Sequence, residues 1–229
     1  MPEQLTTTSY AILGLLAIRP WTAYELAGQM ERSLRHFWPR AESRVYEEPK
    51  RLAGLGLASA TPQAVGRRTK TLYTITPEGR RVLSSWLAEP GGDPQLECES
   101  LLKVFFADHG TKQATLAHID AMRQWADRRT AENIRIPRGY LDGDTPFPER
   151  LAQIVVVGRL LTDFADVVRS WADWATAVVD DWPETPAGAE PDWATIREIA
   201  SRPLPGSPAA AQPASSSDAV VARRSSSLP

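Results

Sequence analysis

The chain has 229 residues, of which 42% are hydrophobic and 24% are charged. These values resemble those of soluble globular domains and exclude wholesale disorder and a collagen-like repeat, and the length suits one or two domains. The longest apolar run, residues 11–18, is much shorter than the roughly 18 residues that a membrane span needs. No basic leader precedes it, and Cys98 is the single cysteine. We therefore expect a cytoplasmic protein with no signal peptide, disulfide framework or membrane partner.

The formal net charge of −2 is distributed unevenly along the chain. Residues 1–90 carry a net charge of +4, residues 91–200 carry −8 and residues 201–229 carry +2. A basic N-terminal third on an acidic body indicates that the first part meets a polyanion and that the rest does not.

The first part is predicted to contain three helices in succession. The first, over residues 7–18, is mostly apolar, and the second begins at Thr22, which forms a capping box with Glu25. The third is expected over about residues 41–55 and ends at a glycine. Its expected inner face consists of Val45, Leu52 and Leu55.

A change of pattern after the third helix predicts a β-hairpin and a fourth helix. Two β-prone runs, residues 57–63 and 69–76, are joined by a charged tip over residues 64–68. Thr76 then caps a helix that has Pro77 in its first turn. Three helices followed by a two-stranded ribbon are the winged variant of the helix-turn-helix, in which the third helix enters the major groove of DNA.

The second part is predicted to be helical, over residues 96–109, 111–135 and 148–182, with a loop over 139–148. The apolar stripes of these helices exceed what one small bundle buries, which indicates a partner surface. The residues proposed for this surface are Leu101, Phe105, Leu160, Leu161, Phe164 and Val168.

Composition sets the domain boundaries. A Pro- and Gly-rich segment, residues 89–94, separates a winged helix-turn-helix domain over residues 1–90 from a helical domain over residues 95–182. Residues 183–200 are expected to form a short helix or linker, and the Ser-, Ala- and Pro-rich residues 201–229 a disordered tail. The fold class is therefore mainly α with a small β-hairpin.

DNA binding is the function that the first domain predicts. Basic side chains at the ribbon tip would neutralise phosphates, and polar side chains on the third helix would meet base edges. An isolated basic hairpin tip is more often a solvated turn, but here it follows three predicted helices. The predicted DNA-contacting residues are Thr22, Tyr24, Ser43, Arg44, Tyr46, Glu47, Lys50, Arg51, Arg67, Arg68 and Lys70.

No pattern in the sequence predicts catalysis, a metal or another cofactor. His36, His109 and His118 form no zinc-binding spacing, and a meeting of the last two between adjacent helices is the alternative that the sequence leaves open. The thiol of Cys98 lies between Glu97 and Glu99, which disfavours its activation. We therefore expect that the chain is not an enzyme.

Tryptophans in the helical part are candidates for an effector site. Trp125, Trp171 and Trp174 would form an aromatic wall for a flat hydrophobic or phenolic ligand, although packing in the core or at a dimer interface explains them equally simply. The helix predicted over residues 148–182 also carries acidic residues at 163, 166 and 173, which would favour a cationic ligand or simply face solvent.

Several segments of the first domain resemble the PadR-type transcriptional regulators in order and spacing. They are residues 5–16 (LTTTSYAILGLL), 22–26 (TAYEL), 36–39 (HFWP), 43–47 (SRVYE), 50–52 (KRL), 54–57 (GLGL) and 73–79 (YTITPEG), with Trp86 and Leu87. Residues 101–106 (LLKVFF) are similar to the start of the C-terminal helical region in the longer members.

The resemblance implies a homodimer that crosses its C-terminal helices, binds an inverted-repeat operator in double-stranded DNA, and usually represses. Release by a small molecule is common in the family, and Tyr46 and Lys50 are similar in position to its DNA-contacting residues. One departure is Pro49, where many members have leucine, and a proline inside the third helix predicts a kink or a loosened turn.

The sequence therefore predicts a sequence-specific DNA-binding regulator, a homodimeric repressor released by a small hydrophobic or aromatic effector. The alternative is a protein-interaction module whose winged helix no longer reads DNA, and Pro49 and the acidic body are its support. An enzyme with an aromatic pocket is a second rival that lacks a nucleophile, base or metal set.

Overall fold

The structure is a computed structural model that describes residues 4–38, 45–65 and 68–205. It contains two compact units that divide between Leu96 and Glu97, and each is described separately here. The division falls just after the Pro- and Gly-rich segment that composition singles out as a boundary.

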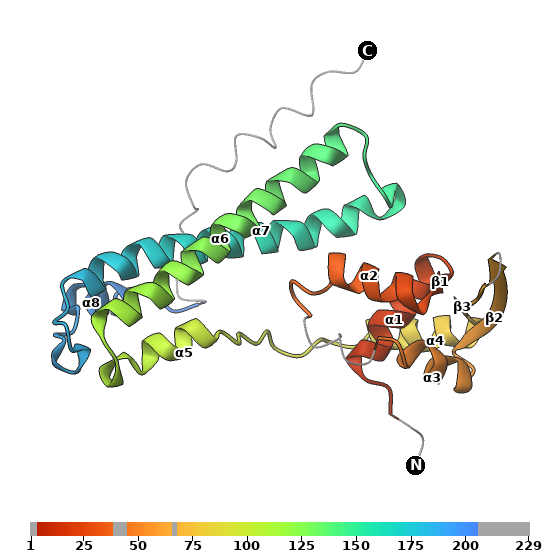
Figure 1. Cartoon of the computed structure of the whole chain (residues 1–229), viewed down its shortest axis with the longest axis horizontal. Helices are drawn as coiled ribbons and strands as arrows, with labels where there is room; N and C mark the ends of the chain where they lie inside the picture. The colour runs from red at the N-terminus through yellow and green to blue at the C-terminus, as the bar shows by residue number, and fades with distance from the viewer. Residues whose placement is uncertain (1–3, 39–44, 66–67, 206–229) are drawn as a thin grey trace. The chain divides into compact units, whose positions relative to one another are not determined.

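The first unit combines helices with a small antiparallel sheet (Figure 1). The sheet has the strand order β1-β3-β2. Strands β2 and β3 form the wing, and the short strand β1, which precedes α2, pairs with β3. The elements are α1 (Thr7–Ile18), β1 (Trp21–Thr22), α2 (Ala23–Ser33), α3 (Glu48–Gly54), β2 (Ala58–Val65), β3 (Arg68–Ile75) and α4 (Pro77–Leu87).

A cluster of aliphatic side chains around Trp21 forms the core of this unit. The indole of Trp21 is 1% exposed and donates a 2.8 Å hydrogen bond to the carbonyl oxygen of Leu15, so its polar atom is satisfied inside the core. Tyr10 on α1 is stacked on Trp86 of α4, with 4.7 Å between ring centroids. The side chains that are most completely buried with Trp21 are Ile12, Leu13, Leu16, Leu26 and Leu52.

The third helix is shorter than the sequence predicted, and the reason is Pro49. Helix α3 begins at Glu48, and Val45 to Glu47 form a turn, whereas residues 41–44 lie outside the described residues. Pro49 therefore stands in the first turn, where its missing N–H has no partner to lose. Of the two alternatives, the described residues show no kink within α3, and a turn over Val45 to Glu47 stands where helix was expected. Leu55 is also 39% exposed rather than on the inner face, because it follows the end of the helix.

The second unit is a helical bundle dominated by the long pair α6 and α7, which lie side by side (Figure 1). Helix α6 continues through Pro137 to Leu141, beyond the predicted end at residue 135. The elements are α5 (Glu99–Phe105), η2 (Ala107–His109), α6 (Lys112–Leu141), η3 (Pro148–Arg150), α7 (Leu151–Asp180), η4 (Pro186–Gly188) and α8 (Trp193–Ala200).

Small side chains allow the close contact between α6 and α7. Ala126 on α6 and three alanines of α7 are buried, and Ile119 packs with Val179 near the end of the pair. Val168, predicted to belong to a partner surface, is instead 9% exposed, because it shares the inner face of α7 with these alanines. The buried alanines of α7 are Ala165, Ala172 and Ala175.

In the described part of the chain, no helix has the length and apolar composition needed to cross a lipid bilayer.

A tight joint connects α3, the wing and α4. The amide of Thr76 donates to the carbonyl oxygen of Leu57 at 3.1 Å, and the Thr76 hydroxyl donates to the carbonyl oxygen of Gly56 at 2.7 Å. The Thr76 hydroxyl also accepts from the amide of Gly79 at 3.0 Å and so caps α4. A Cβ atom at position 79 would lie 2.1 Å from the Leu57 carbonyl oxygen, so only glycine fits there.

We expect Gly79→Ala to destabilise the first unit by about 2–4 kcal/mol, because the backbone of the joint must move apart. The measurement is chemical denaturation. Gly14→Ala in α1 is the matched control, since an added Cβ there meets nothing within 4 Å. The control should be neutral or stabilising by up to about 1 kcal/mol. Equal stability of the Gly79→Ala variant and the wild type would contradict the close approach.

Candidate nucleic-acid interface

The start of α2 is fixed by the capping box that the sequence predicted. The Thr22 hydroxyl accepts from the amide of Glu25 at 3.2 Å, and the Glu25 carboxylate accepts from both the amide and the hydroxyl of Thr22 at 2.8 Å. Thr22 therefore serves as the helix cap. Tyr24, the next predicted contact residue after Thr22, is 79% exposed on the first turn of the helix.

The wing lies beside the start of α2. Strand β1 pairs with β3 through Trp21 opposite Tyr73 and Thr22 opposite Leu72. Hydrogen bonds from Thr22 lower the pKa of the Glu25 carboxyl, and the positive charges of Arg19 and Lys70 lower it further. The exposed ammonium group of Lys70 on β3 and the exposed phenol of Tyr24 on α2 thus belong to neighbouring elements.

The turn before α3 and the helix itself present further polar groups to solvent. Tyr46 is 58% exposed, and Glu47 and Lys50 are exposed. Glu47 is the N-cap of α3 but forms no side-chain capping bond, so its carboxylate is not used by the helix start. Ser43 and Arg44, which were also predicted as contacts, lie outside the described residues.

Arg51 differs from the other predicted contacts, because its guanidinium points into the domain. It forms an ion pair with Glu48 at 2.6 Å and donates to the Ser9 hydroxyl and to the carbonyl oxygen of Gln4. The sequence prediction that Arg51 contacts DNA therefore needs correction, since its nitrogen atoms are engaged within the protein.

The wing strands extend further toward the tip of the ribbon than predicted. Strands β2 and β3 pair antiparallel up to Val65 opposite Arg68, and Lys70 lies opposite Gln63 on the exposed part of the ribbon. Of the predicted cations at the tip, Arg67 lies outside the described residues, as does the side chain of Arg68. The described part of the wing thus offers Lys70 as a phosphate ligand.

The second unit holds the side chains that were considered for metal binding or redox chemistry. His109 lies 3.4 Å from the Asp108 carboxylate, and the Cys98 sulfur lies 4.0 Å from that of Met122. Among the described residues, no group of three or more histidine, cysteine, aspartate or glutamate side chains is arranged to hold a metal ion.

The three tryptophans proposed for an effector site have different surroundings. Trp125 on α6 forms an edge-to-face contact with Phe164 on α7, with 6.0 Å between ring centroids. Trp171 packs against the buried cluster around Ile119, and Trp174 is 44% exposed. Trp125 with Phe164, and separately Trp174, therefore present aromatic surface, whereas Trp171 is partly buried against the core.

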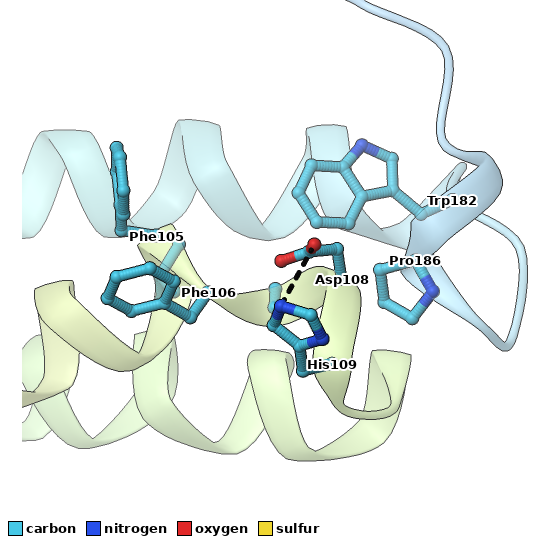
Figure 2. Close-up of a pocket in the computed structure, with 8 residues that line it drawn as sticks. Phe105, Phe106, Asp108, His109, Trp182 and Pro186 are labelled. Carbon is cyan, nitrogen blue, oxygen red and sulfur yellow. Dashed lines mark ion pairs between the residues drawn. The ribbon is translucent and has the colours of Figure 1, made fainter.

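A surface hollow that the sequence did not reveal lies at one end of the bundle (Figure 2). Its volume is about 480 Å³, and it includes the imidazole–carboxylate pair of His109 and Asp108. The aromatic side chains within residues 104–109 are a sequence signal for this hollow, but Trp182 and Pro186 are brought to it only by folding. The lining residues are Val104, Phe105, Phe106, Ala107, Asp108, His109, Trp182 and Pro186.

The first unit has the architecture of a winged helix-turn-helix protein, with α2 and α3 followed by a two-stranded wing. Residues 12–85 match the model of the family described as "Transcriptional regulator PadR-like family". Over these residues the chain is similar to the regulators of this family. The match names regulators rather than enzymes, in agreement with the sequence prediction.

Individual relatives support the same assignment. The chain is 31% identical over 99 residues to the negative transcriptional regulator PadR of Bacillus subtilis, which covers 42% of this chain and 54% of the relative. The chain spans about half the length of the curated relatives that it matches.

Solved structures extend the likeness of fold beyond the first unit. The crystal structure of Bacillus subtilis PadR in complex with operator DNA is similar with a TM-score of 0.67 at 21% identity, covering 76% of this chain and 100% of that one. The structure of the same protein with p-coumaric acid has a TM-score of 0.60 at 22% identity, covering 77% and 100%. The second unit therefore also has the fold of these regulators.

The capping box at the start of α2 predicts a pH-dependent stability. The folded state lowers the pKa of Glu25 from 4.5, so the stabilisation is present above pH 4.5 and is lost as the pH falls through the folded pKa. We expect Glu25→Gln to cost about 1 kcal/mol at pH 7 and less at pH 3. Urea denaturation at both pH values measures this difference. A cost that is the same at both pH values would contradict the role of the carboxylate.

Proposed function

We propose that this protein is a sequence-specific transcriptional regulator that binds double-stranded DNA as a homodimer. The observation that carries the proposal is the exposed polar face on neighbouring elements of a PadR-like domain. Tyr24 on α2, Tyr46 and Lys50 at α3, and Lys70 on the wing supply phenol and ammonium groups for phosphates and base edges. The net charge of +4 on residues 1–90 favours the same polyanionic partner.

The operator is expected to be an inverted repeat, because a two-fold symmetric dimer presents two equivalent recognition helices. Its half-sites would be centred about 10 bp apart, or one turn of the double helix. We propose that the protein acts as a repressor in the cytoplasm. The related regulator of Bacillus subtilis is described as negative and was crystallised on operator DNA, which supports this proposal.

The salt dependence of DNA binding tests the proposed interface. We expect the full chain to bind a duplex from upstream of its own gene more tightly than a scrambled duplex, as measured by fluorescence anisotropy. Lys50→Ala and Lys70→Ala should each reduce the slope of log K against log salt by about 0.9, because each removes one phosphate contact. Lys103→Ala on α5 is the control, since this exposed lysine pairs with Glu99 in the second unit.

The same measurement separates the two classes of function. A wild-type protein that binds no duplex at low salt would overturn the DNA proposal and favour a protein-interaction module. An Arg67/Arg68/Lys70→Ala variant with unchanged affinity and slope would remove the wing from the interface. Equal, weak binding to both duplexes would contradict sequence-specific reading of this operator.

An apolar surface on the second unit supports the proposed homodimer. Leu160 is 70% exposed and Phe105 is 78% exposed, and Leu101 and Phe164 are each more than a third exposed, while Leu161 is half-buried. A monomer gains nothing from so many exposed large apolar side chains, whereas a second copy would bury them. Val168 is excluded from this surface by its burial.

We expect Leu160→Asp to weaken the dimer, because it would place a charge in an apolar interface. Sedimentation equilibrium should show at least a tenfold rise in the dimer dissociation constant. Asp163→Asn, which alters an exposed polar side chain one turn away, is the control. A dimer that is equally tight in Leu160→Asp would show that α7 does not supply the interface at this position.

We further propose that a small hydrophobic or aromatic molecule regulates DNA binding through the second unit. The contact between Trp125 and Phe164 and the exposed ring of Trp174 support a planar ligand, and a related regulator was crystallised with p-coumaric acid. A phenolic acid and a cationic aromatic amine are the two classes to titrate into the protein–DNA complex. DNA affinity that is unchanged at saturation by both would contradict this part of the proposal.

A further inference from the structure

A buried polar cluster connects α3 to the beginning of α1. Glu48 is 5% exposed and Ser9 is fully buried, so neither side chain can reach a molecule outside the domain. Between them lies the guanidinium of Arg51, 2.6 Å from the Glu48 carboxylate and 3.4 Å from the Ser9 hydroxyl. A second nitrogen of Arg51 donates to the carbonyl oxygen of Gln4 at 3.2 Å.

This guanidinium joins two parts of the chain that lie more than 40 residues apart in sequence. The partners Glu48, Ser9 and Gln4 belong to the first turn of α3, the first turn of α1 and the segment before α1. Ser9 is itself held in a capping box, in which its hydroxyl accepts from the amide of Thr6 and its amide donates to the Thr6 hydroxyl. The planar fork of an arginine suits several acceptors at once, whereas a lysine offers one compact charge.

We propose that Arg51 and Glu48 are positioning residues for DNA reading, which rests on the proposed function above. They fix the orientation of α3 on the domain and contact no DNA. The ion pair itself lies within α3, where the buried Glu48 carboxylate holds the Arg51 guanidinium in place. The bonds of that guanidinium to Ser9 and to the carbonyl oxygen of Gln4 then attach α3 to the beginning of α1 and fix its orientation. Lys50, adjacent in sequence, is exposed and would therefore be presented to DNA in a defined direction.

The positioning role and a direct contact differ in what they predict. A phosphate contact contributes to the salt slope and little to sequence preference, whereas the orientation of α3 affects which bases its side chains can reach. Glu48 separates the two roles most sharply, because its side chain is buried. Removing its negative charge should strengthen DNA binding slightly if only net charge matters, and should weaken specific binding if orientation matters.

The test compares Glu48→Gln, Arg51→Ala and Arg51→Lys with Lys50→Ala as the exposed neighbour. Anisotropy on operator and scrambled duplexes across a salt series gives both the sequence preference and the slope. We expect the first three variants to lose about tenfold in preference for the operator, comparable to one lost base contact, with an unchanged slope. Lys50→Ala should lower the slope by about 0.9.

Thermal unfolding checks that each variant is folded, and Glu48→Gln/Arg51→Gln, which removes both charges, replaces Arg51→Ala if that variant unfolds. Hydrogen exchange gives a readout that needs no DNA, in which the variants should exchange the amides of Leu52 to Gly54 at least tenfold faster than the wild type.

Operator preference unchanged in Glu48→Gln, or a reduced slope in Arg51→Lys, would overturn the positioning role alone. Absence of DNA binding by the wild type would instead overturn the proposed function, and with it any role of the pair in reading.

Discussion

The joint at which the carbonyl group of Leu57 approaches Gly79 determines how the first unit is assembled. It brings the end of α3, the wing and the start of α4 to one place, through hydrogen bonds that Thr76 makes to Gly56, Leu57 and Gly79. Because the distances leave no space for a side chain at position 79, the start of α4 lies directly against the backbone that connects α3 to the wing. The positions of the exposed side chains on α3 and on the wing therefore do not depend on contacts that those side chains make.

A second constraint acts at the opposite end of α3. There Arg51 bridges Glu48, Ser9 and the Gln4 carbonyl, and thus ties the helix start to α1. A seven-residue helix has little stability of its own, so its orientation depends on these two attachments. The exposed residues near it, Tyr46 and Lys50, form the proposed reading surface.

The features predicted correctly from the sequence are those that depend on neighbours in the chain. The capping residues Thr22 and Thr76 are observed as predicted, because a cap bonds to an amide three residues away. The start of α3 was wrong, because Pro49 was assigned to a helix interior rather than to a first turn. Arg51 was assigned to DNA because two of its partners, Ser9 and Gln4, lie more than 40 residues away, where no local pattern points to them.

The second unit shows the same limit of sequence reasoning. Apolar spacing predicted the long helices but not which apolar residue faces inward, so Val168 was placed on a partner surface although it is buried. The hollow beside His109 needs Trp182 and Pro186, which come close to it only after α6 and α7 have returned the chain to its start. Long-range closure of this kind leaves no signal in spacing or composition.

The alanine-lined contact between α6 and α7 has a consequence for how stability depends on concentration. Small side chains bring the two helices close together, but they bury little apolar area per residue, while larger side chains such as Leu160 and Val156 remain outside. In the proposed dimer, much of the unfolding free energy of this unit would come from association. The midpoint of thermal unfolding would then rise with protein concentration, and a cell that makes few copies of the regulator would hold a fraction of it as less stable single chains.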